Sequence, residues 1–291
     1  MAVTAPAGLR DTAQPVSQPA SRRPRRPSFS PRATLSNFWR PMALLVALLA
    51  GWWAVTEAEL VAPYILPSPA DTWATARENA AYLAQNTWVT TWETVIGFAI
   101  AAVFGVLMAV VMVYSSNVEK TVYPLILFAQ VVPKIAIAPL FIVWLGFGPS
   151  PKILVAVLMA FFPVVISCLA GLRTVDPEIL ELTSTMGASR FKTFMKIRFP
   201  ASLPQLMSGL KVAATLAVTG AVVGEFVGSN EGLGYVILQA NGNVDTAMLF
   251  AALIIMSFLG IVLFAIIEIA EKLLIPWHSS RRAASSTTHA V

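Results

Sequence analysis

Lys134 and Glu225 are charged side chains that lie inside long apolar stretches of the sequence. A charge within a membrane segment is costly and often marks a pathway for a solute or ion. Glu225 is interpreted either as a pore or gate residue or as an interfacial carboxylate paired with backbone or a lysine. Lys134 is either a pore cation suited to an anionic substrate or a structural lysine that pairs with Glu225 or snorkels.

Motifs for chemistry on the chain itself are absent from the sequence. No G-x-x-x-x-G-K-[ST] phosphate loop occurs, so the chain does not hydrolyse ATP by that route. The two histidines, His278 and His289, are close to the C-terminus, and Cys168 is the one cysteine. We therefore expect no catalytic site, no metal site and no cofactor. If the protein drives an energised process, the energy would come from a partner protein or an ion gradient. An ion-driven transporter and an integral membrane enzyme therefore stay as alternatives to a process that a partner protein drives.

The composition requires a membrane. Hydrophobic residues make up 57% of the 291 residues and charged residues only 12%, against about 25% charged in soluble domains. Apolar runs long enough for a bilayer predict an all-α polytopic protein with about six spans. They are expected at residues 42–55, 92–114, 122–145, 153–172, 207–227 and 246–269, with a polar, glycine-rich loop at 228–245.

The cations are sorted by side of the membrane. If the N-terminus is inside, sixteen of the 20 Lys and Arg residues fall on the inner side. Two, Arg77 and Lys152, fall in outer loops, and Lys134 and Lys211 lie within spans. This asymmetry favours an N-in/C-in protein with six spans and argues against nucleic acid as the reason for the net charge of +5.

The chain divides into one membrane domain and two tails. Residues 1–41 are rich in Pro, Ser and Arg and are predicted to be a disordered, basic cytoplasmic tail. Residues 42–275 form the predicted membrane domain, with a cytoplasmic loop at 173–202, and residues 276–291 form a second cytoplasmic tail. We expect the first apolar run to be a retained anchor rather than a cleaved signal peptide.

The loop after the fourth span has a distinctive design. Asp176, followed by Pro177 and Glu178, predicts a helix start, and Ile179, Leu182 and Met186 would share one face. Gly187 is placed where a helix would end in a sharp turn. Ser189 would cap a second helix, and Pro200 would stop it. Two short helices joined by a glycine bend at the cytoplasmic surface predict a docking element.

The same loop resembles the signature of ABC importer permeases, E-A-A-x3-G-x9-I-x-L-P. Glu181, Gly187, Ile197 and Pro200 match it at the required spacing, while Leu182, Thr183 and Phe199 replace the two Ala and the Leu. The resemblance implies the fold of a type I importer permease in the plasma or inner membrane. It also implies docking on a separate ATPase, with this set of coupling residues: Glu178, Glu181, Leu182, Met186, Gly187, Ala188, Ser189, Arg190, Ile197 and Pro200.

Further stretches resemble the nitrate, taurine and aliphatic-sulfonate branch of these permeases. They include Pro133 to Ala136, Pro139 to Gly148, and Gly232 to Ile237. The sequences around Lys134 (Pro133 to Ala136) and Glu225 (Gly220 to Phe226) are most similar to members that move pyrimidine vitamin precursors or riboflavin. The resemblance implies a homodimer, a cytoplasmic ATPase pair that binds ATP and Mg²⁺, an extracytoplasmic binding protein, and alternating access. Gly232, Gly234 and Tyr235 are expected at the outer gate.

Overall fold

The computed structural model describes residues 31–275, with side chains from Trp39 onward. These residues form two compact units, one ending at Ala50 and one beginning at Gly51. The boundary lies inside helix α1 (Pro31–Glu57), which begins well before the predicted first span at residue 42. The tails at 1–30 and 276–291 lie outside the described residues, so the predictions made for them stay predictions.

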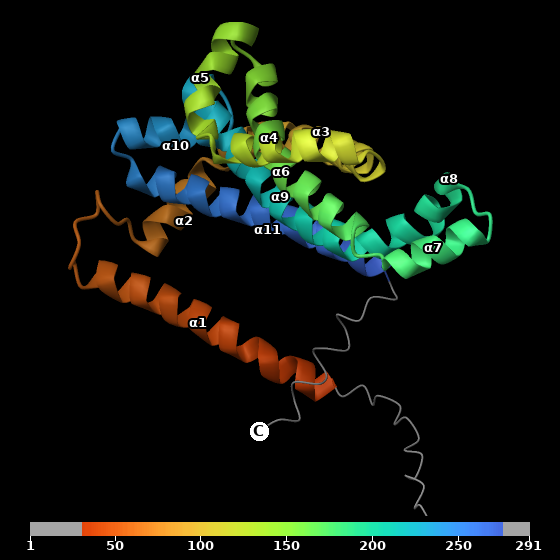
Figure 1. The fold of residues 1–291 in the computed structure, drawn as a ribbon. Helices are drawn as coiled ribbons and strands as arrows, with labels where there is room; N and C mark the ends of the chain where they lie inside the picture. Colours follow the sequence, from red (N-terminus) through yellow and green to blue (C-terminus); the bar gives the residue numbers. More distant parts are fainter. Residues whose placement is uncertain (1–30, 276–291) are drawn as a thin grey trace, which may run out of the picture. The chain divides into compact units, whose positions relative to one another are not determined.

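The unit that begins at Gly51 is built from helices throughout its described part (Figure 1). After α1 come α2 (Pro69–Glu78), α3 (Ala80–Tyr114), α4 (Ser116–Val131), α5 (Lys134–Leu145) and α6 (Pro149–Leu172). The second half holds α7 (Pro177–Thr185), α8 (Arg190–Thr193), the π-helix η1 (Phe194–Arg198), α9 (Phe199–Gly228), α10 (Leu233–Gly242) and α11 (Thr246–Leu274).

The six predicted spans each correspond to helices in this chain. Five helices within residues 31–275 are long and apolar enough to cross a membrane, and α4 with α5 makes a sixth if the pair counts as one broken span. The bend between α4 and α5 is 96° and falls at Val132 and Pro133. Proline lacks the backbone N–H that would continue the helix, which explains the position of the break. Pro139 and Pro163 stand inside α5 and α6.

The core is formed where α3, α6 and α9 pack together. Small side chains line the contact, and Ala101, Ala160, Ala213 and Ala217 are all fully buried. At Gly105 an added Cβ would lie 2.8 Å from Val164 Cγ1, so only glycine permits this approach of α3 and α6. Close packing of small residues is the expected way for membrane helices to associate.

Two predictions about connections are wrong. The stretch expected to be a polar loop at 228–245 contains the helix α10, whose buried Leu233, Val236 and Ile237 pack with Leu83 of α3 and with Ala252. Pro200 does not stop a helix, because the chain runs from η1 directly into α9 with Pro200 in its first turn. Proline is tolerated in a first turn, where its missing N–H has no intrahelical partner.

Candidate coupling segment and buried polar network

The coupling segment, residues 173–202, begins with the predicted helix. In α7, Asp176 is the N-cap and its Oδ1 accepts a hydrogen bond from Glu178 N at 3.0 Å. Pro177 occupies the first turn, as the sequence predicts. A cap of this kind stabilises a helix end by about 1 kcal/mol, which matters for a helix of only 9 residues.

The end of α7 is a Schellman motif centred on Gly187. Gly187 has φ +70°, its N–H donates to Ser184 O at 3.1 Å, and the N–H of Ala188 donates to Thr183 O at 3.0 Å. The left-handed conformation is the reason that glycine suits this position. The predicted bend is present, and Ser189 then caps α8 by accepting from Lys192 N at 3.3 Å.

The apolar face of α7 is exposed. Ile179, Leu182 and Met186 expose 46%, 61% and 76% of their surface, and Phe191 of α8 exposes 71%. The segment lies at one end of the long helices, opposite α10 (Figure 1). It holds five Lys and Arg residues, for which the positive-inside rule predicts the cytoplasmic side. Exposed apolar residues on a polar, cationic loop are the ordinary mark of a protein-binding surface.

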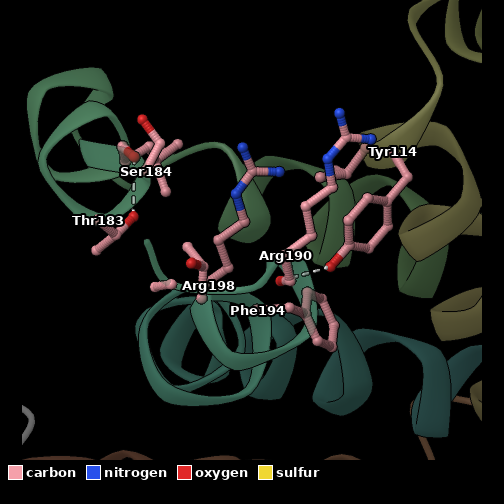
Figure 2. A pocket seen from close by; sticks show the side chains of 10 residues that line it. Tyr114, Thr183, Ser184, Arg190, Phe194 and Arg198 are labelled. Carbon is pink, nitrogen blue, oxygen red and sulfur yellow. Dashed lines mark hydrogen bonds between the residues drawn. The ribbon is translucent and has the colours of Figure 1, made fainter. Parts of the chain in front are cut away.

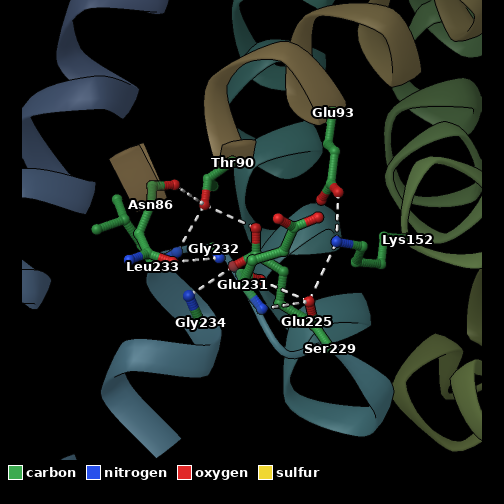
Figure 3. A network of polar contacts seen from close by, with 10 residues as sticks. All are labelled: Asn86, Thr90, Glu93, Lys152, Glu225, Ser229, Glu231, Gly232, Leu233 and Gly234. Carbon is green, nitrogen blue, oxygen red and sulfur yellow. Dashed lines mark hydrogen bonds and ion pairs between the residues drawn. The ribbon is translucent and has the colours of Figure 1, made fainter. Parts of the chain in front are cut away.

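The second site is the polar network, a buried cluster around the start of α10 (Figure 3). α10 lies at the other end of the long helices from α7 (Figure 1). The centre of the polar network is Glu225, which is 0% exposed. Glu225 Oε1 accepts from Thr90 Oγ1 at 2.6 Å, and Oε2 accepts from Gly234 N at 2.5 Å. The carboxylate thereby joins α3, α9 and the first turn of α10.

Three side chains together cap α10. Asn86 Oδ1 accepts from Gly232 N at 2.7 Å, and Thr90 Oγ1 accepts from Leu233 N at 2.8 Å. Glu225 takes the third N–H, that of Gly234. The first N–H groups of a helix have no partner within it, and here each of these three is satisfied from another helix. Gly232 has φ +101° and Gly234 stands against the Glu225 carboxylate, which explains both glycines.

A buried ion pair extends the polar network. Lys152 is 2% exposed, and its Nζ lies 2.5 Å from Glu93 Oε1 and donates to Ser229 Oγ at 3.1 Å. The prediction that Lys152 belongs to an outer loop is therefore wrong, since it lies in the first turns of α6. The Glu93 carboxylate on α3 compensates the charge of this buried lysine, which would otherwise be strongly destabilising.

Three residues of the network, Asn86, Thr90 and Glu93, were not predicted from the sequence. A signal was present, because they recur at helical spacing on one face of α3. Lys134 is not part of the polar network: its Nζ donates to Gln130 O at 2.8 Å and lies 4.9 Å from the centre of the Phe162 ring. The suggested pairing of Lys134 with Glu225 is thus wrong. Tyr235 follows the capped turn and is half-buried.

The fold of this chain is similar to that of a solved ABC transporter. The chain superimposes on the permease of the MetNI methionine ABC transporter in its inward-facing form, with a TM-score of 0.61 over 67% of this chain and 97% of that one. Sequence identity there is 18%, so the likeness concerns the fold. It is the fold of a type I importer permease.

The family follows from the sequence comparison. Residues 101–277 match the family described as binding-protein-dependent transport system inner membrane component, and the chain belongs to it. It is 36% identical over 239 residues to the formylaminopyrimidine transport permease protein ThiX of Halalkalibacterium halodurans, covering 82% of this chain and 96% of the relative. The chain is a multi-pass inner-membrane permease subunit of an ABC importer for small solutes.

Two other relatives have named solutes. The riboflavin transport system permease protein RibX of Chloroflexus aurantiacus is 33% identical over 260 residues, covering 86% of this chain and 96% of its own length. The taurine transport system permease protein TauC of Escherichia coli is 27% identical over 241 residues, covering 80% and 88%. The family implies partner ATPase and substrate-binding proteins.

Proposed function

We propose that the coupling segment joins this permease to its ATPase, that two copies of the chain form the translocation pathway, and that the solute is an uncharged, hydrogen-bonding heterocycle. The observation that carries the coupling proposal is the exposed apolar face of α7, with Leu182 61% and Met186 76% exposed. A short helix capped at both ends presents this face as a rigid unit, and a groove on the ATPase would bury it.

The mechanism follows from a rigid α7. Closure of the ATPase pair on ATP would bring the two docked α7 helices together. The segment runs through α8 and η1 into α9 without a break, so a displacement of α7 would be passed to a 30-residue membrane helix. Opening toward the outer side to receive solute is the expected result, which is domain rearrangement of the rigid-body kind.

The pathway proposal rests on the exposed side of α9. Between Ser208 and Thr219 its exposed residues are Ser208, Val212, Thr215 and Thr219, so three of four carry hydroxyls. The exposed residues of α3 from Val95 to Val111 are all apolar, as a lipid-facing surface requires. The hydroxyl-bearing face of α9 is defined by Ser208, Thr215 and Thr219. In a membrane, such a face is best placed on a water-filled path shared with a second copy.

The solute proposal rests on the charge of that face. Its hydroxyls are neutral, and the nearby cation Lys211 is neutralised, with its Nζ 2.5 Å from Glu271 Oε2. A path of hydroxyls suits a solute that exchanges hydrogen bonds with water. Relatives named for formylaminopyrimidine and riboflavin are also more similar to this chain than the one named for taurine. A sulfonate or nitrate substrate would instead require Lys134 to line the path.

The coupling proposal is tested with Leu182→Glu. The control is Leu60→Glu, because Leu60 is also exposed, at 74%, but is far from α7 in sequence and on the predicted outer side. Both variants are co-expressed with the ATPase and binding protein, and the ATPase retained on the purified permease is measured. We expect Leu182→Glu to lose most of the ATPase and Leu60→Glu to keep it. Equal retention by both would refute docking through α7.

A further inference from the structure

A cavity lies behind the coupling helix, on the side of α7 away from its exposed apolar face. Its volume is about 330 Å³, and Leu180 and Thr183 of α7 form one wall. Tyr114 at the end of α3 and Arg190, Phe194 and Arg198 form the rest (Figure 2). Docking through the exposed apolar face of α7 does not fill this cavity, and neither does the proposed solute pathway.

The depth of the cavity is set by the ends of two spans. Tyr114 is the last residue of α3, and Arg198 directly precedes α9. Both helices are long and apolar enough to cross a membrane. The span predicted at residues 92–114 ends at Tyr114, which places the cavity where the hydrocarbon ends and the headgroups begin on the cytoplasmic side. Tyrosine is enriched at that level.

The charge of the cavity is positive and uncompensated. Arg190 and Arg198 both line it, none of the lining residues is acidic, and neither arginine forms an ion pair within residues 39–275. By contrast, Arg173 in the same loop pairs with Glu119. In Figure 2 the guanidinium groups of Arg190 and Arg198 point in the same direction. Two planar guanidiniums of this kind suit the oxygens of a phosphate.

Three of the four hydroxyls that line the cavity, all but that of Thr193, already donate within the chain. Thr183 and Ser184 already donate to Leu180 O and Glu181 O, at 2.8 and 2.7 Å. The Tyr114 hydroxyl donates to Arg190 O at 3.4 Å. The arginines are therefore the principal donors, which is the pattern for an anion rather than for a sugar or a cation.

The π-helix η1 builds this wall. A π-turn closes on the fifth residue rather than the fourth, and Phe194–Arg198 is such a turn. Thr193, Phe194 and Arg198, at the two ends of this turn, all line the cavity. π-turns are rare and are frequent at functional sites.

We propose that this cavity binds the phosphate of an anionic phospholipid from the cytoplasmic leaflet. Anionic lipids are concentrated there, and basic pockets between membrane helices bind their headgroups. The apolar side chains of Leu180 and Phe194 and the depth at the span ends favour a lipid over a soluble phosphate. A lipid held there would brace α7 from behind, whatever solute the permease carries.

The test uses the purified transporter with its ATPase and binding protein, stripped of lipid in detergent. Phosphatidylglycerol and phosphatidylcholine are titrated, and bound lipid is counted by native mass spectrometry. The variant is Arg190→Gln/Arg198→Gln. The control, Lys192→Gln/Lys196→Gln, removes the same charge from the same segment outside the cavity. A third variant, Arg190→Lys/Arg198→Lys, keeps the charge and the fold but loses the planar donors.

The expected result is tight binding of phosphatidylglycerol over phosphatidylcholine. Two lost arginine contacts of about 1 kcal/mol each weaken it by roughly thirtyfold in the Arg→Gln variant, at about 1.4 kcal/mol per factor of ten. The lysine control keeps the wild-type affinity, and Arg→Lys is intermediate. Equal weakening by the control, or no lipid preference in the assembled transporter, would overturn the proposal. Displacement of the lipid by millimolar inorganic phosphate would assign the cavity to a soluble anion instead.

Discussion

Thr90→Val is the perturbation that tests the capped α10 most selectively. Valine has nearly the shape of threonine, so packing is preserved while the hydroxyl is lost. That hydroxyl donates to Glu225 Oε1 at 2.6 Å and accepts from Leu233 N at 2.8 Å. Thr90 is 0% exposed, so water does not replace either hydrogen bond.

The magnitude follows from these two contacts. A hydrogen bond contributes about 0.5–1.5 kcal/mol, and a buried N–H left without a partner costs about 1–3 kcal/mol. The first turn of α10 should therefore open more easily by ~2 kcal/mol. At about 1.4 kcal/mol per factor of ten, this is roughly a thirtyfold larger open population.

Amide hydrogen exchange of α10 measures this opening directly. The control is Thr91→Val, because the Thr91 hydroxyl donates only within its own helix, to Thr87 O at 2.6 Å. We expect exchange in residues 233–242 to accelerate about thirtyfold or more in Thr90→Val and to stay near wild type in Thr91→Val. The same exchange rate in both variants would refute the idea that side chains from α3 hold α10.

Three further perturbations follow from the same geometry. Gly187→Val places a β-branched residue at φ +70° and should weaken the end of α7 by about 1–2 kcal/mol. Gly187→Asn should cost less, because asparagine tolerates this conformation. Solute-stimulated ATPase activity should fall in Gly187→Val and largely persist in Gly187→Asn. Lys152→Met strands the Glu93 carboxylate and should destabilise the permease by about 3–5 kcal/mol, while Lys152→Met/Glu93→Gln should recover most of the loss in thermal unfolding in detergent. Gly234→Ala puts a Cβ 2.8 Å from Val222 O, so we expect accelerated exchange in α10 and an unchanged α7.

The spans and the coupling segment could be predicted from sequence because their causes are local. Apolar length defines a span, and Asp176, Gly187 and Ser189 each act on the backbone within a few residues. The polar network could not be predicted as a whole, because Glu225 and Thr90 are 135 residues apart and only the fold brings them together. α10 was not predicted because glycines at its start are typical of a loop. The side chains on α3 and α9 that cap this helix are far away in the sequence.

Lys152 illustrates a different limit. A lysine beside prolines and glycines is normally solvated, so its place in the sequence indicates a loop. In the structure Lys152 is buried and paired with Glu93, and no local feature of residues 149–153 predicts this burial. The π-helix is likewise invisible in the sequence, since its extra residue per turn is set by how α8 meets α9.

We propose that this permease moves its solute with energy that an ATPase delivers through α7. The most direct measurement is uptake of radiolabelled formylaminopyrimidine, riboflavin and taurine, in separate assays, into proteoliposomes that hold the permease and ATPase, with binding protein outside and ATP inside. We predict uptake of at least one heterocycle that requires ATP, persists when proton and sodium gradients are collapsed, and is lost in Leu182→Glu. Uptake driven by an ion gradient without ATP, or undiminished in Leu182→Glu, would contradict the account.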